Sequence, residues 1–452
     1  MNIRKFKKEI NAGRGSAILA LKNGIAQGDD RYKDAVLYAC LHDTCYDAQC
    51  EPYRCDYLFE AITLTGDTDY FENKIIEKLY KVTYFRIHDQ LTGLLYLFHK
   101  NGSKKAGVAL QNRFDDLIIK LPRIRVYRYT PRESAENIAI WLFKIYGIKS
   151  FIESAKKIGG LLLKTGYEYV IFYDDFLSEA KEKFGEERIN ELLKKEAEKS
   201  EEVKYLFDVI NADNDNRENS GKNYKGDTIT LQDVISWVDD PGRRWMNVYI
   251  FGNRLARNST PKELNEIADL IETTDNLRLK LTLISVFRIA DYPKSVDKLF
   301  EFYENGETEE IKRTTLEALG RFEDKRIHDL AIYNLQNDLY VEDSLDMLKN
   351  NFQGEYEIIL NALKSYKAFN KYSYHSLTMA IKHIFENITS PEVKEILLFD
   401  YHKNRCASCR EFMIKKMCET KCIPENILEE CLYDSHTEIR KIATKYKEQN
   451  VK

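Results

Sequence analysis

The chain has 452 residues, of which 43% are hydrophobic and 31% charged, and its net charge is −4, a composition typical of a folded, soluble protein. This length exceeds what one compact core holds and predicts two or three domains or an extended array. With only 20 Gly and 8 Pro, the chain is expected to be mostly helical. Neither a signal peptide nor an apolar run long enough to cross a membrane is apparent, so we expect a cytoplasmic protein without a membrane partner.

Charge is distributed unevenly along the chain. Residues 1–166 carry 27 Lys and Arg against 19 Asp and Glu, and the remainder carries 42 against 54. The whole basic excess lies in residues 101–166, with 13 basic and 5 acidic residues. Such a segment suits an anionic partner, although chance variation in surface charge would give the same balance.

In chain order, residues 1–166 come first and predict an N-terminal region of helix pairs. Apolar residues recur there at the three- and four-residue spacing of amphipathic helices. The expected helices are 15–27, 31–43, 51–65, 69–82, 84–100 and 104–120.

Within this region, Cys40, Cys45, Cys50 and Cys55 follow one another at a step of five residues. On one continuous helix that step turns each thiol by about 140° from the last, so the four cannot converge on one metal ion. We expect a helix, a turn and a second helix, with Cys40 and Cys55 as small core residues. A cysteine-based metal site is the alternative.

The turn between these cysteines is polar. Its candidate ligand-binding residues are Asp47, Gln49, Glu51 and Arg54. A helix-capping network with Glu51 and Arg54 paired across three residues explains them equally well, and the sequence favours it.

The basic segment holds the strongest binding candidate, the stretch "LPRIRVYRYTPRES". Guanidinium groups clamp phosphates and tyrosine rings stack on bases, while Tyr, Trp and Arg also dominate protein interfaces. Alternatively, the arginines pair with acidic residues of the same chain. The candidates are Arg123, Arg125, Tyr127, Arg128, Tyr129 and Arg132, to which a later stretch adds Arg243, Arg244 and Trp245.

Residues 167–261 predict an irregular, charged middle region. The segment 167–176 is strand-like in composition but has no evident partner strand, and 177–206 reads as a charged helix. Residues 211–227 read as a polar, mobile loop, where we place a domain boundary.

The second half contains a repeated layout. Segments 284–302 and 316–335 each hold an apolar helix ending in Arg-apolar-x-Asp, at Arg288–Asp291 and Arg321–Asp324, followed by a second amphipathic helix. Paired helices repeating at 33 residues are typical of an α-solenoid.

These units resemble HEAT repeats, which place Asp in the turn and an apolar residue and Arg at the start of the second helix. The matching residues are Asp275, Leu277 and Arg278, then Ile311 and Arg313, then Asp434, Ile439, Arg440 and Ala443. The resemblance implies an all-α, α-solenoid fold of degenerate HEAT-like repeats, with the clearest repeat domain at 262–452.

A second cysteine cluster lies within that domain. His402, Cys406 and Cys409 have tolerable spacing for zinc ligands. A helix over 406–417 would place Cys409 beside Met413 and Met417 on its apolar side, so core thiols are favoured and zinc is the alternative.

The sequence thus favours a non-catalytic scaffold or adaptor that binds a protein partner on the concave face of a helical-repeat fold. The first alternative is a nucleic-acid-binding protein that uses the basic segment, and the weaker alternative is a metal- or thiol-dependent enzyme. No Gly-rich phosphate loop or nucleophile elbow is present, so the sequence assigns neither a catalytic residue nor a cofactor.

Overall fold

The structure is a computed structural model, and it describes residues 1–47, 51, 54–123, 130–166, 170–220, 229–238, 240, 248–370 and 372–450. Over these residues the fold is all-α, 75% helical, with 26 α-helices and no strand. The scarcity of Gly and Pro agrees with this helical content.

The chain forms two compact units, one of which is built from both ends of the sequence. Unit 1 comprises Met1–Tyr224 and Glu425–Lys452, and unit 2 comprises Lys225–Pro424. The division at 224/225 falls within the 211–227 segment where the sequence places a boundary, whereas the assignment of α25 and α26 to unit 1 divides the region 262–452.

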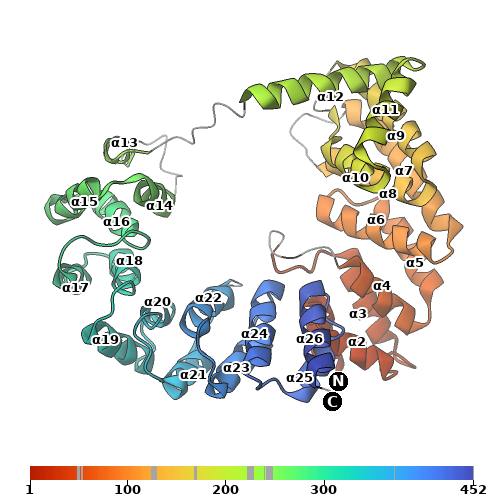
Figure 1. The fold of residues 1–452 in the computed structure, drawn as a ribbon. Coiled ribbons are helices and arrows are strands. Elements are labelled where there is room, and N and C mark those ends of the chain that lie inside the picture. The colour runs from red at the N-terminus through yellow and green to blue at the C-terminus, as the bar shows by residue number, and fades with distance from the viewer. Residues whose placement is uncertain are drawn as a thin grey trace. The chain divides into compact units, whose positions relative to one another are not determined.

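Unit 1 contains fourteen of the α-helices (Figure 1). Their bounds are α1 Ile3–Asn11, α2 Gly15–Lys22, α3 Asp30–Leu41, α4 Cys55–Thr65, α5 Thr68–Leu79, α6 Phe85–Lys100, α7 Lys104–Lys120, α8 Thr130–Tyr146, α9 Ile148–Thr165, α10 Asp174–Phe184, α11 Glu186–Ala197, α12 Glu201–Ser220, α25 Glu425–Cys431 and α26 Thr437–Asn450.

The six helices expected in the first 120 residues are confirmed as α2 to α7, within a few residues at each end. Their ends follow local signals. The Ser103 hydroxyl caps α7 by accepting from the Ala106 N–H at 3.2 Å, and α4 ends at Gly66, whose φ of +77° is easily reached without a side chain.

The middle region differs from the expectation in two places. The prediction of one charged helix over 177–206 is wrong, because the chain breaks at Gly185, with φ of +92°, and again between α11 and α12. The loop prediction is wrong for residues 211–220, which complete α12. This segment is polar, but it contains neither Gly nor Pro before Gly221, so nothing in it stops the helix.

The described residues in the remainder of the middle region contain no strand. In the strand-like segment, residues 167–169 lie outside the described part of the chain and Asp174–Phe176 begin α10. Residues 221–227 of the predicted loop also lie outside it.

The C-terminal helix α25 packs against α2, and two glycines allow the close approach. A Cβ on Gly15 would lie 1.7 Å from the Glu430 carbonyl oxygen, and one on Gly13 would lie 2.1 Å from the Ser435 hydroxyl. The Ser435 N–H donates to the Gly13 carbonyl at 2.8 Å. The two ends of the sequence therefore share one core.

Unit 2 contains the other twelve α-helices. Their bounds are α13 Leu231–Trp237, α14 Val248–Asn258, α15 Pro261–Thr273, α16 Leu277–Val286, α17 Val296–Glu304, α18 Glu309–Leu319, α19 Lys325–Gln336, α20 Val341–Met347, α21 Tyr356–Ser365, α22 Ser373–Phe385, α23 Lys394–Lys403 and α24 Ala407–Glu419.

The even-numbered helices of unit 2 form one row, in which each packs on the next from α14 to α24 (Figure 1). Odd-numbered helices pack against this row, with α15 on α16, α17 on α18, α19 on α20 and α23 on α24. Residues at the centre of each row helix are fully buried, among them Leu283, Leu316 and Leu345.

None of the helices that the structure describes combines the length and apolar composition that a membrane crossing requires.

Candidate functional site

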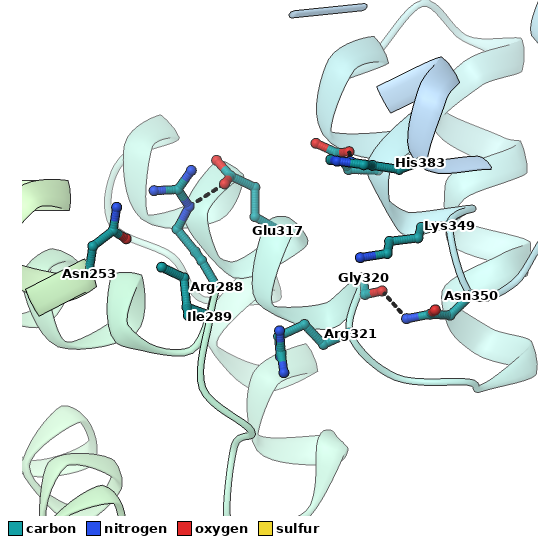
Figure 2. Close-up of a pocket in the computed structure, with 10 residues that line it drawn as sticks. Asn253, Arg288, Ile289, Glu317, Gly320, Arg321, Lys349, Asn350 and His383 are labelled. Carbon is teal, nitrogen blue, oxygen red and sulfur yellow. Dashed lines mark hydrogen bonds and ion pairs between the residues drawn. The ribbon is translucent and has the colours of Figure 1, made fainter. Parts of the chain in front are cut away.

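A polar pocket of about 410 Å³ lies in unit 2, where four successive row helices end (Figure 2). Its lining residues are Asn253, Arg288, Ile289, Glu317, Gly320, Arg321, Asp346, Lys349, Asn350 and His383.

Four of the row helices, α16, α18, α20 and α22, each bring one basic side chain to this pocket. Arg288 follows α16, Arg321 follows α18, Lys349 follows α20, and His383 lies in the last turn of α22. A helix C-terminus carries partial negative charge, which favours a cation at each of these positions. The repeat of the helices therefore produces a row of four basic residues.

Most of these basic residues also join neighbouring helices. Arg288 forms an ion pair with Glu317 of α18, and its guanidinium lies 4.7 Å from the centre of the Tyr249 ring. Arg321 pairs with Asp291 at 2.5 Å, and His383 Nδ1 lies 3.2 Å from an Asp346 carboxylate oxygen. Part of the row therefore stabilises the packing of unit 2.

The Glu317 carboxylate is largely removed from water. Burial raises its pKa above the usual value, and the charge and hydrogen bond of Arg288 act in the opposite direction. Arg288 is thus paired with Glu317, and an anion that binds Arg288 would have to displace the Glu317 carboxylate.

Lys349 is different, because it is exposed and forms no ion pair with the residues that the structure describes. Its side chain points into the pocket in Figure 2. Among the described residues, Arg321 forms an ion pair with Asp291 alone, whose side chain is 88% exposed, and exposed ion pairs exchange partners at little cost. Lys349 and Arg321 can therefore accept a carboxylate or phosphate from outside.

A second polar cluster in unit 2 joins His375, Cys406 and Cys409. His375 lies in the first turn of α22, Cys406 directly precedes α24, and Cys409 lies in the first turn of α24. The His375 Nδ1 is 3.1 Å from the Cys409 sulfur, and one ligand atom from each residue lies within 4.8 Å of the others. The sequence candidate His402 is exposed on α23 and does not belong to this group.

The two thiols affect one another. A hydrogen bond with Cys409 lowers the pKa of Cys406, and the same contact together with burial raises the pKa of Cys409.

Among the described residues, the cysteines around the turn before α4 do not gather in this way. Cys40 is buried in α3, Cys45 is half-buried in the turn, and the Cys55 thiol donates to the Gln90 carbonyl at 3.6 Å. Burial raises the pKa of all three, that of Cys55 to about 12. Cys50 lies outside the described residues.

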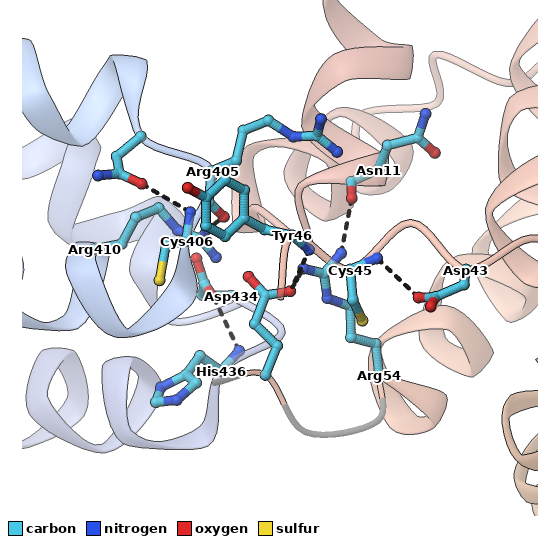
Figure 3. Close-up of polar contacts among 12 residues, drawn as sticks. Asn11, Asp43, Cys45, Tyr46, Arg54, Arg405, Cys406, Arg410, Asp434 and His436 are labelled. Atoms are coloured by element: carbon cyan, nitrogen blue, oxygen red, sulfur yellow. Dashed lines mark hydrogen bonds and ion pairs between the residues drawn. The ribbon is translucent and has the colours of Figure 1, made fainter. Parts of the chain in front are cut away.

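The turn beside these cysteines holds a buried network of an ion pair and hydrogen bonds (Figure 3), although no side chain caps the start of α4. Glu51 and Arg54, each 4% exposed, form the expected ion pair. Glu51 also accepts from the Tyr46 N–H at 3.0 Å, and Arg54 donates to the Asn11 carbonyl at 2.7 Å. Asp47 is half-buried, and Gln49 lies outside the described residues.

The arginine- and tyrosine-rich candidates lie mostly outside the described part of the chain. These are Arg125, Tyr127, Arg128, Tyr129, Arg243, Arg244 and Trp245. Arg123 is exposed at the end of the 3-10 turn Leu121–Arg123, whereas Arg132 is buried in α8. The two described arginines therefore differ in their exposure to solvent.

The basic segment 101–166 also lines a pocket of about 600 Å³ in unit 1. Arg113 and Lys120 of α7 face it, together with Lys81, and Tyr80 contributes a ring 5.9 Å from the Arg113 guanidinium. Asp116 pairs with both Arg113 and Lys120, at 2.8 and 2.6 Å, which reduces the charge available to a ligand.

Sequence reasoning did not single out Lys349, His383 or His375. The 33-residue spacing of Arg288 and Arg321 was a partial signal for the basic row, because Lys349 follows Arg321 by only 28 residues and falls outside the exact repeat. His375 had no such signal, since it precedes Cys406 by 31 residues and approaches it only through the packing of α22 on α24.

Comparison of the chain with protein-family models, curated proteins and solved structures finds no match.

Proposed function

We propose that this protein is a HEAT-like α-solenoid scaffold, without catalysis of its own, that binds an acidic segment of a protein partner at the unit 2 pocket. The observation that carries the proposal is the row of basic residues at the ends of α16, α18, α20 and α22, in which Lys349 forms no ion pair with described residues.

The HEAT-like assignment is supported by how the repeat-motif residues are used. Ile311 is buried at the start of α18, and Arg313 two residues later forms an ion pair with Asp343 of α20 at 2.9 Å. An arginine that reaches the next helix of a row is what stacked helix pairs need, because a single pair cannot cover its own apolar face.

An acidic protein segment is supported by the chemistry of the pocket. In an acidic segment, one carboxylate can replace the exposed Asp291 at Arg321. A neighbouring Asp or Glu can bind Lys349 at the same time, so that two adjacent acidic residues occupy both cations. Repeated cations spaced along a row also suit an extended segment better than one small anion.

The test is a fluorescence-anisotropy titration of the full chain with a labelled, Glu-rich peptide at low and high salt. We expect salt-sensitive binding that weakens at least tenfold in the double variant Arg321→Ala, Lys349→Ala. The matched control Lys325→Ala, Arg326→Ala removes the same charge from the exposed side of α19, and its binding should match that of the wild type. Equal losses in both variants, or no binding by the wild type, would contradict the proposal.

A nucleic-acid-binding function is the second candidate, favoured by the pocket that Arg113, Lys120 and Tyr80 line in the basic segment. The same titration with labelled single-stranded RNA and duplex DNA distinguishes it. Salt-sensitive binding that is lost in the triple variant Arg123→Ala, Arg125→Ala, Arg128→Ala and kept in the Arg321→Ala, Lys349→Ala variant would move the binding site to unit 1.

A further inference from the structure

We propose that His375, Cys406 and Cys409 form a zinc site, in which three protein ligands hold the ion and a small exogenous ligand such as water completes the tetrahedron. Imidazole nitrogen and cysteine sulfur are the ligand types that zinc prefers, and a set of three with an open fourth position recurs in proteins. This inference is independent of the pocket at Arg321 and Lys349.

The distances suit the ion. Tetrahedral zinc with sulfur at about 2.3 Å and nitrogen at about 2.0 Å places its ligand atoms roughly 3.5–3.8 Å apart. The three ligand atoms lie within 4.8 Å of one another, and the His375 Nδ1 is 3.1 Å from the Cys409 sulfur. Adjustments of about half an ångström to one ångström would admit the ion, which side-chain rotation can supply.

The backbone places the two sulfurs on the same side of one helix. Cys406 directly precedes α24 and Cys409 is three residues further on, in its first turn, so their side chains are neighbours. Cys406 is fully buried and Cys409 is 4% exposed, whereas His375 is half-buried. The partly exposed His375 therefore marks the side from which an exogenous ligand could reach the cluster.

A buried hydrogen-bond network fixes the loop that carries Cys406. The Thr378 hydroxyl donates to Asp400 at 2.6 Å and accepts from the Asn404 amide at 2.5 Å. The Asn404 side-chain oxygen in turn accepts from the Cys406 N–H at 2.9 Å, a contact that Figure 3 shows at Cys406. Outer contacts of this kind hold metal ligands in place.

These contacts also distinguish a metal site from ordinary core packing. A core cysteine needs only apolar neighbours, whereas here a carboxylate, an amide and a hydroxyl are buried around it, with Asp400, Thr378 and Asn404 each at most 2% exposed. Burying so many polar groups is costly unless they are paired, and the paired set holds the backbone of Cys406 through its N–H.

The test is a titration of chelator-treated, fully reduced, full-length protein with Co²⁺, followed by competition with Zn²⁺. We expect one Co²⁺ per chain, with near-ultraviolet thiolate-to-metal absorption and visible bands of tetrahedral cobalt, all removed by Zn²⁺. Cys409→Ser should weaken binding at least tenfold, and so should His375→Ala, whose half-buried position makes misfolding a lesser concern than at Cys406.

The matched control is Cys418→Ser, which removes a half-buried thiol from the same helix outside the cluster and should bind Co²⁺ like the wild type. Circular dichroism establishes that each variant is folded. The proposal is overturned if the reduced wild type gives no cobalt bands, or if the bands survive both substitutions. A Cys406–Cys409 disulfide in the protein as purified, with no cobalt bound after reduction, would overturn it in favour of thiol redox chemistry.

Discussion

The turn before α4 and the start of α24 are both rich in cysteine, yet they use it differently. Around the turn before α4 the described thiols sit singly on α3, in the turn and on α4, and the buried ion pair there is formed by Glu51 and Arg54. In unit 2, Cys406 and Cys409 share one helix start and meet His375 from a neighbouring helix. A three-residue step at a helix start keeps two thiols together, and a five-residue step separates them.

The two regions also differ in the pKa values of their thiols. Burial raises the pKa of Cys55 to about 12, so this thiol, which is half-buried and packs against the core of unit 1, stays neutral. The hydrogen bond with Cys409 lowers the pKa of Cys406 instead. The contrast shows that metal binding depends less on the number of cysteines in a segment than on whether the helices that carry them bring the side chains together.

The largest expected effect is on the stability of unit 1 and concerns the Glu51–Arg54 pair. Arg54→Ala leaves the buried Glu51 carboxylate without its cation, which should destabilise unit 1 by about 3–5 kcal/mol. Hydrogen-exchange mass spectrometry in increasing urea would detect the loss in α2 and α4.

The control for that experiment is Arg31→Ala, which breaks an exposed pair with Asp29 and should leave the exchange of α2 and α4 unchanged. If Arg54→Ala is as mild as this control, Glu51 and Arg54 do not hold the turn.

A smaller, pH-dependent effect is expected on the stability of unit 2 and concerns Asp400. Burial raises the pKa of Asp400 to about 7 from its usual value near 3.8, against the hydrogen bonds of Thr378 and Asn404. The folded state therefore binds a proton that the unfolded state releases between these two values, so the stability of metal-free unit 2 should fall as pH rises from about 4 to 7 and stay low above that.

Asp400→Asn keeps an oxygen that accepts from Thr378 and removes the titration. Urea unfolding of the metal-free variant between pH 5 and 8 should lack the part of the slope that Asp400 contributes, on the order of 1–3 kcal/mol over that range. An unchanged slope would show that Asp400 titrates normally in the folded protein.

The smallest expected effect concerns Cys45, which is half-buried in the turn. Cys45→Ser should change the stability of unit 1 by no more than about 0.5 kcal/mol and should leave Co²⁺ binding intact. Urea unfolding and the cobalt titration measure both quantities. A loss of Co²⁺ binding would make the unit 1 cysteines the metal ligands and reverse the comparison.

Local features were predictable from the sequence. Helices α2 to α7 follow from apolar spacing, whereas α1 was not predicted. The Glu51–Arg54 pair follows from its three-residue separation, because it depends only on neighbours in sequence. The continuation of α12 through residues 211–220 was missed because polar composition indicates solvent exposure and does not by itself end a helix.

Features that depend on packing between distant segments were not predictable. The sequence near Gly13 and Gly15 does not indicate that the C-terminal α25 packs there. Glycine is needed at these positions only because of that tertiary contact, which leaves no room for a side chain. His375 reaches Cys409 through the packing of α22 on α24, and one sequence offers no pattern that would select it over His402.

The most direct test of the comparison is X-ray diffraction from zinc-soaked crystals of the full chain, collected on both sides of the zinc absorption edge. The account predicts an anomalous peak bonded to the His375 Nδ1 and to the sulfurs of Cys406 and Cys409, and none among Cys40, Cys45 and Cys55. An empty His375 cluster, or a zinc peak among the unit 1 cysteines, would contradict it.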